Sequence, residues 1–380
     1  MCFRPEPVLQ TQSQPEAEAT LVSPQAKTRA SSEPPVSTVV RKPAAVLKVA
    51  SEESPLTALT NVVTSLPSPT VSYVTAHSPL PAWQLQSPDQ PPPGVANFDQ
   101  ETYNDSNAVA DYAPYIFCYL RTREPFYQVR PDFLSQHELL TNDVRSGCVN
   151  WMVEVQETLE LNHETLYLGV KNLDLFLSNP KPKSAGQYRT PPLPITPNRI
   201  RLVACASLLL AAQYDERLPP PPEDWLQMCD RGYTTAELNT MQQQLFCALN
   251  FDLGAPLSYR FLRRYARACG IDMDLLTLAR YILESSLLDS QFSSESDSKL
   301  AASALWLAVC MKEGPAASLE QRFQLWTPAL QHYSDLHRIG ARLNAWIRTL
   351  PTNADLGTVY SKYSHRVFRR VALIPPLEDL

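Results

Sequence analysis

Residues 144–177 read VRSGCVNWMVEVQETLELNHETLYLGVKNLDLFL, and apolar residues recur along them at three- and four-residue steps. That period predicts two adjoining amphipathic helices. Each helix has one charged residue on the face that should be buried: Arg145 at the edge of the first apolar stripe, and Asp174 inside the second. Because an isolated buried charge costs several kcal/mol, we predict that Arg145 and Asp174 form a buried, hydrogen-bonded, structural ion pair between neighbouring helices.

The helical period continues through most of the chain after residue 108. Predicted helices span about 110–122, 142–161, 163–178, 199–214, 222–230, 234–250, 258–269, 273–289, 296–312, 321–333 and 335–349. Two of these segments, LVACASLLLAA (202–212) and LAASALWLAVC (300–310), are apolar all round and rich in small residues, which is typical of a helix at the centre of a bundle. Their recurrence after roughly a hundred residues predicts a duplicated, all-α domain.

The first 105 residues differ in composition from the rest. They are rich in Pro, Ser, Thr, Gln and Ala and have no sustained helical period, so we predict a disordered regulatory tail. Ser-Pro dipeptides suited to proline-directed kinases occur at Ser23, Ser54, Ser68, Ser78 and Ser87. We expect phosphorylation of at least one of them.

Overall composition excludes several classes of protein. A chain of 380 residues with 44% hydrophobic content is long enough for two domains and a tail, and its net charge of −6 gives no general drive toward nucleic acid. No apolar run is long enough to span a membrane, and the first residues do not resemble a secretory signal. The eight cysteines are scattered without a Cys-x-x-Cys pair, so we interpret them as core residues of an intracellular protein.

The sequence also lacks the motifs of the common catalytic sites. It has no Gly-rich phosphate loop, no Gly-x-Ser-x-Gly and no His-Glu-x-x-His, and its six histidines are dispersed. His163 stands at a predicted helix start, where a capping role is expected. We therefore predict a non-enzymatic binding protein with no cofactor and no metal.

Several motifs in one order resemble the mitotic cyclins. WMVEVQETLELNHETLYL (151–168) is similar to the first cyclin box, and it is followed by YDER (214–217) with prolines, FDLG (251–254), LSYRFLRRYAR (257–267) and TLARYILE (277–284). The sequence of these motifs is most similar to that of B-type cyclins, particularly the third B subfamily, and the resemblance covers residues 108 to 370. The resemblance implies tandem cyclin boxes: two five-helix bundles, preceded by an extra leading helix.

The resemblance also implies domain limits. We predict a tail over 1–105, an N-terminal box with its leading helix over 106–254, a C-terminal box over 255–370, and a C-terminal tail over 371–380. Residues 179–197 are predicted to form a flexible surface loop, longer than the family's usual connection.

The implied partner is a mitotic cyclin-dependent protein kinase, which a cyclin binds and activates at the G2/M transition and in mitosis or meiosis. Carried over position by position, the kinase-binding surface consists of Ile116, Tyr119, Gln213, Tyr214, Gln242, Phe246, Phe251 and Leu253. Gln213 stands where the family has a lysine, and Gln242 where it has a glutamate. Losing the charge assistance of these contacts is expected to weaken binding by about 1–3 kcal/mol per site. Ordinary core packing is the alternative for the apolar positions.

A second surface implied by the resemblance recruits Arg-x-Leu peptides of substrates or inhibitors. This docking patch consists of Val144, Gly147, Cys148, Trp151, Glu154 and Arg201. Glycine replaces a family isoleucine at 147, and Arg201 replaces a glutamine and would repel a basic peptide. We expect weakened or altered docking.

Two rival hypotheses remain open from the sequence. The lost charges and the altered patch favour a divergent cyclin-fold scaffold with weak or absent kinase activation. A nucleic-acid-binding role rests only on Arg260, Arg263, Arg264 and Arg267, a run that usually marks a solvated face.

The tail has no Arg-x-x-Leu destruction motif, and Arg199–Leu202 fits that pattern only inside a predicted helix. The resemblance implies a nuclear location, with the cytoplasm as an alternative.

Overall fold

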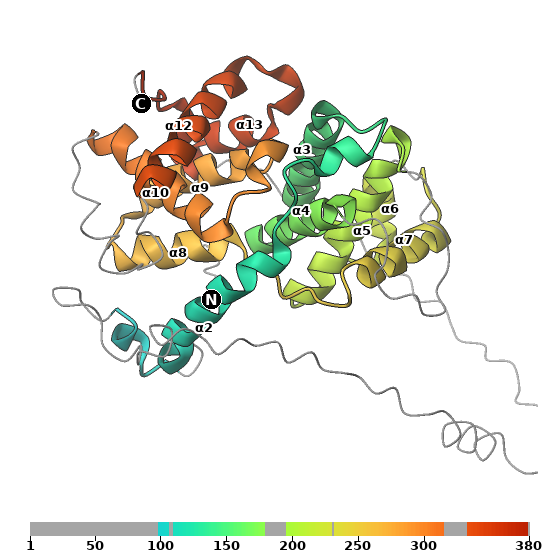
Figure 1. Ribbon diagram of the computed structural model, residues 1–380, viewed down its shortest axis with the longest axis horizontal. Coiled ribbons are helices and arrows are strands. Elements are labelled where there is room, and N and C mark those ends of the chain that lie inside the picture. The colour runs from blue at the N-terminus through green and yellow to red at the C-terminus, as the bar shows by residue number, and fades with distance from the viewer. Residues whose placement is uncertain (1–97, 106–108, 179–194, 230–231, 315–332, 379–380) are drawn as a thin grey trace, which may run out of the picture. The chain divides into compact units, whose positions relative to one another are not determined.

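The computed structural model describes residues 98–105, 109–178, 195–229, 232–314 and 333–378. Within these ranges the regular structure is helical, without a strand (Figure 1). The predicted disordered tail up to residue 97, most of the 179–197 loop and residues 321–332 of the predicted helix 321–333 lie outside them. The α-helices are α2 (Ala113–Arg123), α3 (Asn142–Thr158), α4 (His163–Ser178), α5 (Pro197–Asp215), α6 (Pro222–Met228), α7 (Thr235–Ala248), α8 (Ser258–Ala268), α9 (Met273–Ser286), α10 (Asp297–Glu313), α12 (Tyr333–Thr349) and α13 (Thr358–Ser364).

Local capping explains where several helices begin. The Thr141 side chain accepts a hydrogen bond from the Val144 amide at the start of α3, and Asp272 does the same for Leu275 at the start of α9. At α7, Thr234 and Glu237 cap each other's backbone amides in a capping box. Each cap satisfies amides that have no partner within the helix.

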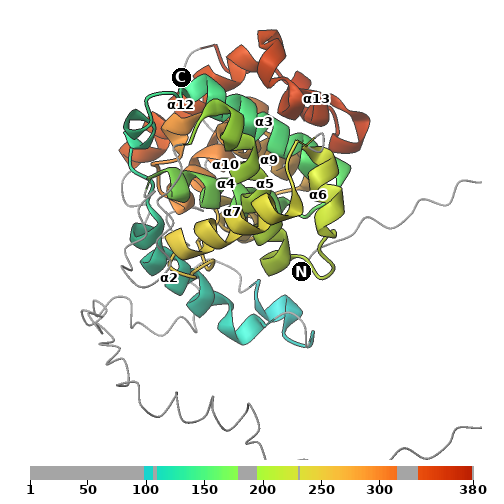
Figure 2. The ribbon, with the colours of Figure 1, turned by 90° about the vertical axis from the view of Figure 1, so that its right-hand side faces the viewer.

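The first bundle, α3 to α7, is built around α5. Every residue from 202 to 212 is buried, and α5 contacts α3, α4, α6 and α7 (Figure 2). Gly169 of α4 lets the two helices approach closely, because a Cβ atom there would lie 2.7 Å from the Leu208 side chain. The predicted central position of this helix is confirmed.

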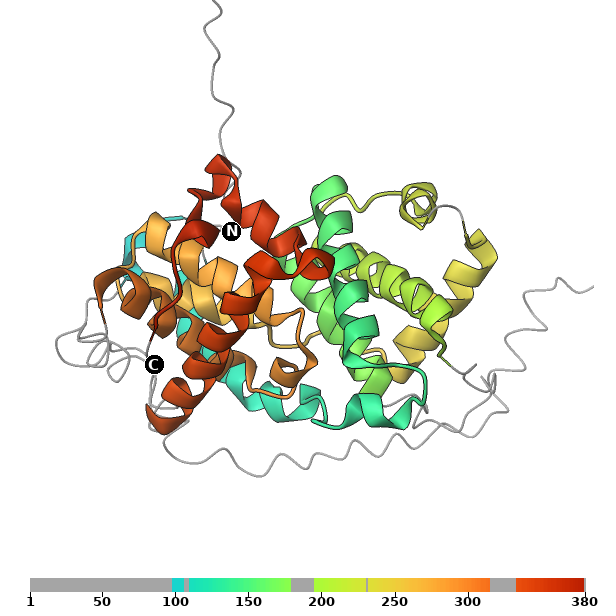
Figure 3. The same ribbon diagram turned by 90° about the horizontal axis from the view of Figure 1, so that it is seen from above.

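The second bundle repeats this arrangement around α10. Residues 300 to 310 are buried, and α10 contacts α8, α9 and α12 (Figure 3). Gly340 of α12 allows a close approach here too, since a Cβ atom would lie 2.5 Å from the Trp306 ring. The duplicated helical domain predicted from the sequence is therefore observed.

The structure corrects both predicted tails. Residues 98–105 were assigned to the disordered tail, but Phe98 is 5% exposed and Asp99 pairs with Arg264 of α8 at 2.5 and 2.7 Å. Residues 371–378 were assigned to a C-terminal tail, but Val371 is buried and the Leu377 backbone exchanges two hydrogen bonds with Asn344 of α12. The helix α13 was missed altogether, because a seven-residue helix offers too short a period to detect.

Candidate functional site

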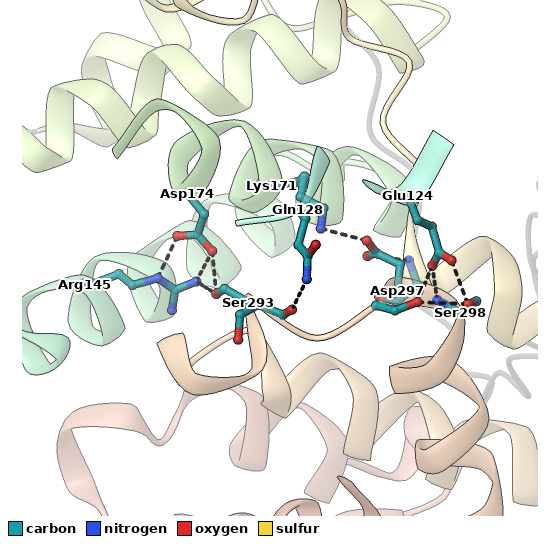
Figure 4. Close-up of polar contacts among 11 residues, drawn as sticks. Glu124, Gln128, Arg145, Lys171, Asp174, Ser293, Asp297 and Ser298 are labelled. Atoms are coloured by element: carbon teal, nitrogen blue, oxygen red, sulfur yellow. Dashed lines mark hydrogen bonds and ion pairs between the residues drawn. The ribbon is translucent and has the colours of Figure 1, made fainter. Parts of the chain in front are cut away.

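The predicted pair of Arg145 and Asp174 is present and fully buried. The guanidinium donates from Nε to Oδ1 at 2.8 Å and from Nη2 to Oδ2 at 2.6 Å, and the two side chains are 0% and 4% exposed (Figure 4). This bidentate geometry joins α3 to α4, as predicted.

The same arginine also joins the two bundles, which the sequence did not indicate. Its Nη1 donates to the carbonyl oxygen of Leu287 at 2.9 Å, just past the end of α9, and its Nη2 contacts the Ser293 hydroxyl at 3.2 Å. Ser293 in turn donates to Asp174 at 2.7 Å. Arg145 therefore supplies a donor to a backbone carbonyl at the α9 C-terminus, where helix carbonyls lack partners.

Further polar contacts surround this junction (Figure 4). Glu124, which follows α2, accepts a hydrogen bond from the Ser298 amide at 2.6 Å and so caps the N-terminus of α10. Lys171 of α4 pairs with Asp297 at 2.7 Å. The leading helix and the first bundle are thus both tied to the start of α10.

A second buried ion pair lies around Glu284 of α9. Lys362 of α13 donates to Glu284 at 2.6 Å and to Gln156 of α3 at 2.8 Å, and the Tyr363 hydroxyl donates to Glu284 at 2.8 Å. His163 Nδ1 lies 3.3 Å from the same carboxylate. Burial alone would raise the pKa of Glu284, but Lys362 and His163 outweigh it and lower that pKa to about 2. A lysine inside the apolar stripe of a short helix was the signal that could have revealed this pair.

Most of the predicted kinase-binding surface is solvent-exposed. Gln213 is exposed, and its exposed large hydrophobic members are Ile116 (41%), Tyr119 (58%), Tyr214 (54%) and Phe251 (59%). Apolar side chains of this size are usually covered, so their exposure on α2, at the end of α5 and after α7 is notable. Leu253 differs, because it is 8% exposed and belongs to the core.

Phe251 is held outward by an unusual backbone. Asn250 and Phe251 have φ angles of 53° and 60°, the left-handed region in which a bulky residue is strained. The Phe251 amide donates to the Phe246 carbonyl at 3.0 Å, and the two rings pack edge to face with centroids 4.9 Å apart. Half-buried Phe246 therefore supports an exposed aromatic ring.

The two glutamines of this surface bond to each other. Gln242 Nε2 donates to Gln213 Oε1, which joins α7 to the end of α5. A lysine and a glutamate at these positions would form an ion pair, whereas the observed pair is neutral. Beside this bond Gln242 Nε2 keeps a second N–H and Gln213 Oε1 keeps a second lone pair, but neither side chain carries a charge.

Arg123, at the end of α2, was not predicted as part of the surface. Its guanidinium contacts the Asp252 carboxylate and the Tyr127 hydroxyl, and it lies 5.8 Å from the ring centroid of Tyr119. Because Asp252 follows Phe251 directly, Arg123 fixes α2 against the strained segment. The exposed aromatic residues of α2 and of this segment therefore form one surface.

The residues predicted to form the docking patch differ in exposure, since Cys148 and Trp151 are buried while Gly147, Glu154 and Arg201 are exposed. Trp151 and Cys148 are each 7% exposed, and the Arg201 guanidinium lies 5.3 Å from the centre of the Trp151 ring. Gly147 is exposed, and a Cβ atom built there meets nothing within 4 Å. Glu154 accepts a hydrogen bond from Thr358 of α13 at 2.9 Å, and Val144, near the start of α3, is half-buried.

The arginine run of α8 is used for contacts within the chain. Arg260 pairs with Glu164 at 2.7 Å, and Arg263 contacts the same carboxylate at 3.3 Å. Arg264 pairs with Asp99, and Arg267 donates to the Phe98 carbonyl at 3.0 Å. The run is therefore only partly a solvated face, because its side chains are 11–44% exposed and each contacts another part of the chain. The observation that favoured nucleic-acid binding has a structural explanation.

The described cysteines are free thiols, and Cys148, Cys205 and Cys310 are buried as predicted, while Cys247 is half-buried. Burial raises the pKa of Cys148 to about 12, so its thiol stays protonated at neutral pH.

In the described ranges no three His, Cys, Asp or Glu side chains gather as a metal site would require. None of the helices described is long and apolar enough to cross a membrane.

Comparison with known proteins identifies the family. The sequence profile of the cyclin N-terminal domain matches residues 115–254, and that of the cyclin C-terminal domain matches residues 256–377. The chain is 42% identical over 293 residues to the G2/mitotic-specific cyclin-B3 of Drosophila melanogaster, covering 76% of this chain and 48% of that protein. It is 38% identical to the protein of the same name from Gallus gallus (77% and 68% covered) and 36% identical to that from Caenorhabditis elegans (74% and 70%). The chain thus spans about half the length of the fly relative and about two thirds of the other two.

Proposed function

This chain belongs to the cyclin family, among the mitotic B-type cyclins, and from that premise we propose that it binds and activates a mitotic cyclin-dependent protein kinase. Cyclins are regulatory subunits rather than enzymes. In our proposal the exposed surface formed by α2, the end of α5 and the segment after α7 docks on a mobile helix of the kinase and stabilises its active arrangement. Activation is then a population shift, supplied by the difference in affinity for the active and inactive kinase conformations.

The exposed Phe251 is the observation that carries this proposal. A strained backbone persists only where the surrounding structure holds it, and such strain gathers at functional sites. Here the Phe251 side chain is presented to solvent by its strained backbone, by the Phe246 ring that packs against it, and by the neighbouring Arg123–Asp252 pair. Pre-organised, exposed aromatic residues are typical anchors of protein interfaces.

Binding of purified kinase to the full chain tests the proposal. Phe251→Ala is expected to weaken affinity by about 2 kcal/mol, roughly thirtyfold, as for an aromatic anchor. Met273→Ala is the control, because Met273 is also exposed, at 53%, but lies on α9 in the second bundle. Equal affinity of the two variants would show that the Phe251 region is not the interface.

The neutral Gln213–Gln242 bond favours one second candidate, a cyclin-fold scaffold that activates a kinase weakly or not at all. Two glutamines that satisfy each other have less to gain from a partner than two charges would. A scaffold would bind the kinase without raising its activity, so activity measured at saturating chain separates the two functions.

Roles of the docking patch, cellular location and timing are further parts of the proposal. We propose weak recruitment of Arg-x-Leu peptides, residence in the nucleus, and action at the G2/M transition and in meiosis. Imaging of the tagged full chain through the cell cycle tests the location and the timing together.

A further inference from the structure

The segment that leads from α5 into the first residue of α6 reads Arg217-Leu218-Pro219-Pro220-Pro221-Pro222, and the sequence largely dictates its backbone. Each proline fixes its own φ near −65°, and each residue before a proline is driven to extended ψ values. The consecutive prolines therefore favour the polyproline II conformation for residues 219–221, which follow a bend at 217–218. The structure agrees, because Pro221 has φ −68° and ψ 157°.

This segment is displayed to solvent. Leu218 is 87% exposed, the highest fraction among the large exposed hydrophobic residues described. Arg217, Pro219 and Pro221 are exposed as well, while Pro220 and Pro222 are half-buried. An apolar edge of leucine and prolines, with a cation beside it, therefore faces outward.

Both ends of the segment are anchored, so its shape is preformed. The Glu216 carboxylate accepts hydrogen bonds from the Asn162 amide and the Thr165 hydroxyl, both at 2.6 Å. At the other end the indole of Trp225, a fully buried residue, donates to the Pro220 carbonyl at 3.1 Å. A segment held in this way loses little conformational freedom on binding.

We propose that residues 217–222 form a docking site for a protein module with an aromatic-lined, proline-binding groove, as in SH3, WW or EVH1 domains. A polyproline II helix repeats every three residues, and the extended ψ of Pro221 places Pro222, the first residue of α6, on the same edge as Pro219, in the P-x-x-P spacing that such grooves take. Leu218 extends the apolar edge, and Arg217 offers a charge to an acidic rim. The kinase-binding surface does not use these residues, so the site is independent of the proposed kinase activation.

Titration calorimetry tests the site. The full chain is titrated separately with three purified domains: one SH3, one WW and one EVH1 domain. The variant Leu218→Ala, Pro219→Ala, Pro221→Ala changes exposed side chains only. Its thermal midpoint is expected to fall by only a few degrees, because each lost proline costs about 0.4–1 kcal/mol through the entropy of the unfolded chain. We expect at least one domain class to bind, and the triple variant to bind it at least tenfold more weakly.

The chain has other consecutive prolines, at 34–35, 91–93, 191–192 and 375–376, and the two most proline-rich stretches, 91–93 and 191–194, require a matched control. The variant Pro92→Ala, Pro192→Ala is expected to bind as the unaltered chain does. The proposal is overturned if none of the three domains binds, or if binding is lost in this control variant and kept in the triple variant.

Discussion

Replacing Arg145 by methionine tests how the two bundles are held together. The change keeps the apolar stem but removes every donor, and Asp174 then keeps only the Ser293 hydroxyl at 2.7 Å. Removing one partner of a buried ion pair typically costs about 3–5 kcal/mol, because the other charge is left buried and uncompensated. The Leu287 carbonyl also loses its donor. We therefore expect Arg145→Met to lower the free energy of unfolding by about 3–5 kcal/mol.

Urea unfolding followed by circular dichroism measures this loss, and the chain provides a matched control. Arg130 also holds an aspartate, Asp132, through two hydrogen bonds at 3.1 and 2.9 Å, but both side chains are more than half exposed. Arg130→Met is expected to leave the unfolding midpoint unchanged, because exposed pairs contribute little. A second transition in Arg145→Met would further show that the bundles unfold separately.

The double variant Arg145→Met, Asp174→Leu separates the ion pair from the carbonyl contact. Removing both charges is often nearly neutral, so the double variant should recover part of the loss, but not the part due to the Leu287 carbonyl. A loss below about 1 kcal/mol for Arg145→Met, or a double variant as unstable as the sum of the single changes, would refute the reasoning.

Three further predictions concern other parts of the molecule. The pKa of Glu284 falls from 4.5 to about 2 on folding, so its ionised form stabilises the native state above pH 4.5, and that stability is lost as the pH falls toward 2. In acid unfolding curves, Glu284→Gln should therefore lose less stability over this pH range than the unaltered chain. Gly147→Ala should raise the thermal midpoint, because the added methyl group meets open space and alanine favours a helix by about 0.5–1 kcal/mol, whereas Gly340→Ala should lower it through its clash with Trp306. The double variant Gly147→Ile, Arg201→Gln should bind an Arg-x-Leu peptide roughly tenfold more tightly, because it restores apolar contact area and removes a positive charge. Fluorescence anisotropy measures this affinity, and an unchanged value would show that residues 147 and 201 do not limit docking.

The fold could be predicted from the sequence because its helices are long and strongly periodic. The apolar segments 202–212 and 300–310 indicated both central helices, and the misplaced charges Arg145 and Asp174 indicated their pairing. In both cases the pattern is local. Exposing an apolar helix or burying an unpaired charge would cost so much free energy that few other arrangements are possible. Short elements such as α13 and the ordered segment 98–105 carry no such period, and only their tertiary contacts stabilise them.

The candidate site was predicted from the resemblance to mitotic cyclins, position by position, and not from any local pattern. Exposure of Tyr119, Tyr214 and Phe251 agrees with a surface role, while burial of Leu253 could not be read from its place beside Phe251. The contacts of Arg145 with the second bundle join residues more than a hundred positions apart. No periodicity in sequence encodes contacts of that kind, and the arginine run of α8 was misjudged for the same reason.

The most direct test of the central claim is phosphorylation of a histone peptide by a purified mitotic cyclin-dependent kinase, titrated with the full chain and with Gln213→Lys, Gln242→Glu. If apolar contacts suffice, the unaltered chain raises kinase activity to a plateau, and the double variant reaches that plateau at a concentration roughly tenfold or more lower. Stimulation by the double variant alone, with none by the unaltered chain at any concentration, would contradict the claim and leave a cyclin fold that no longer activates the kinase.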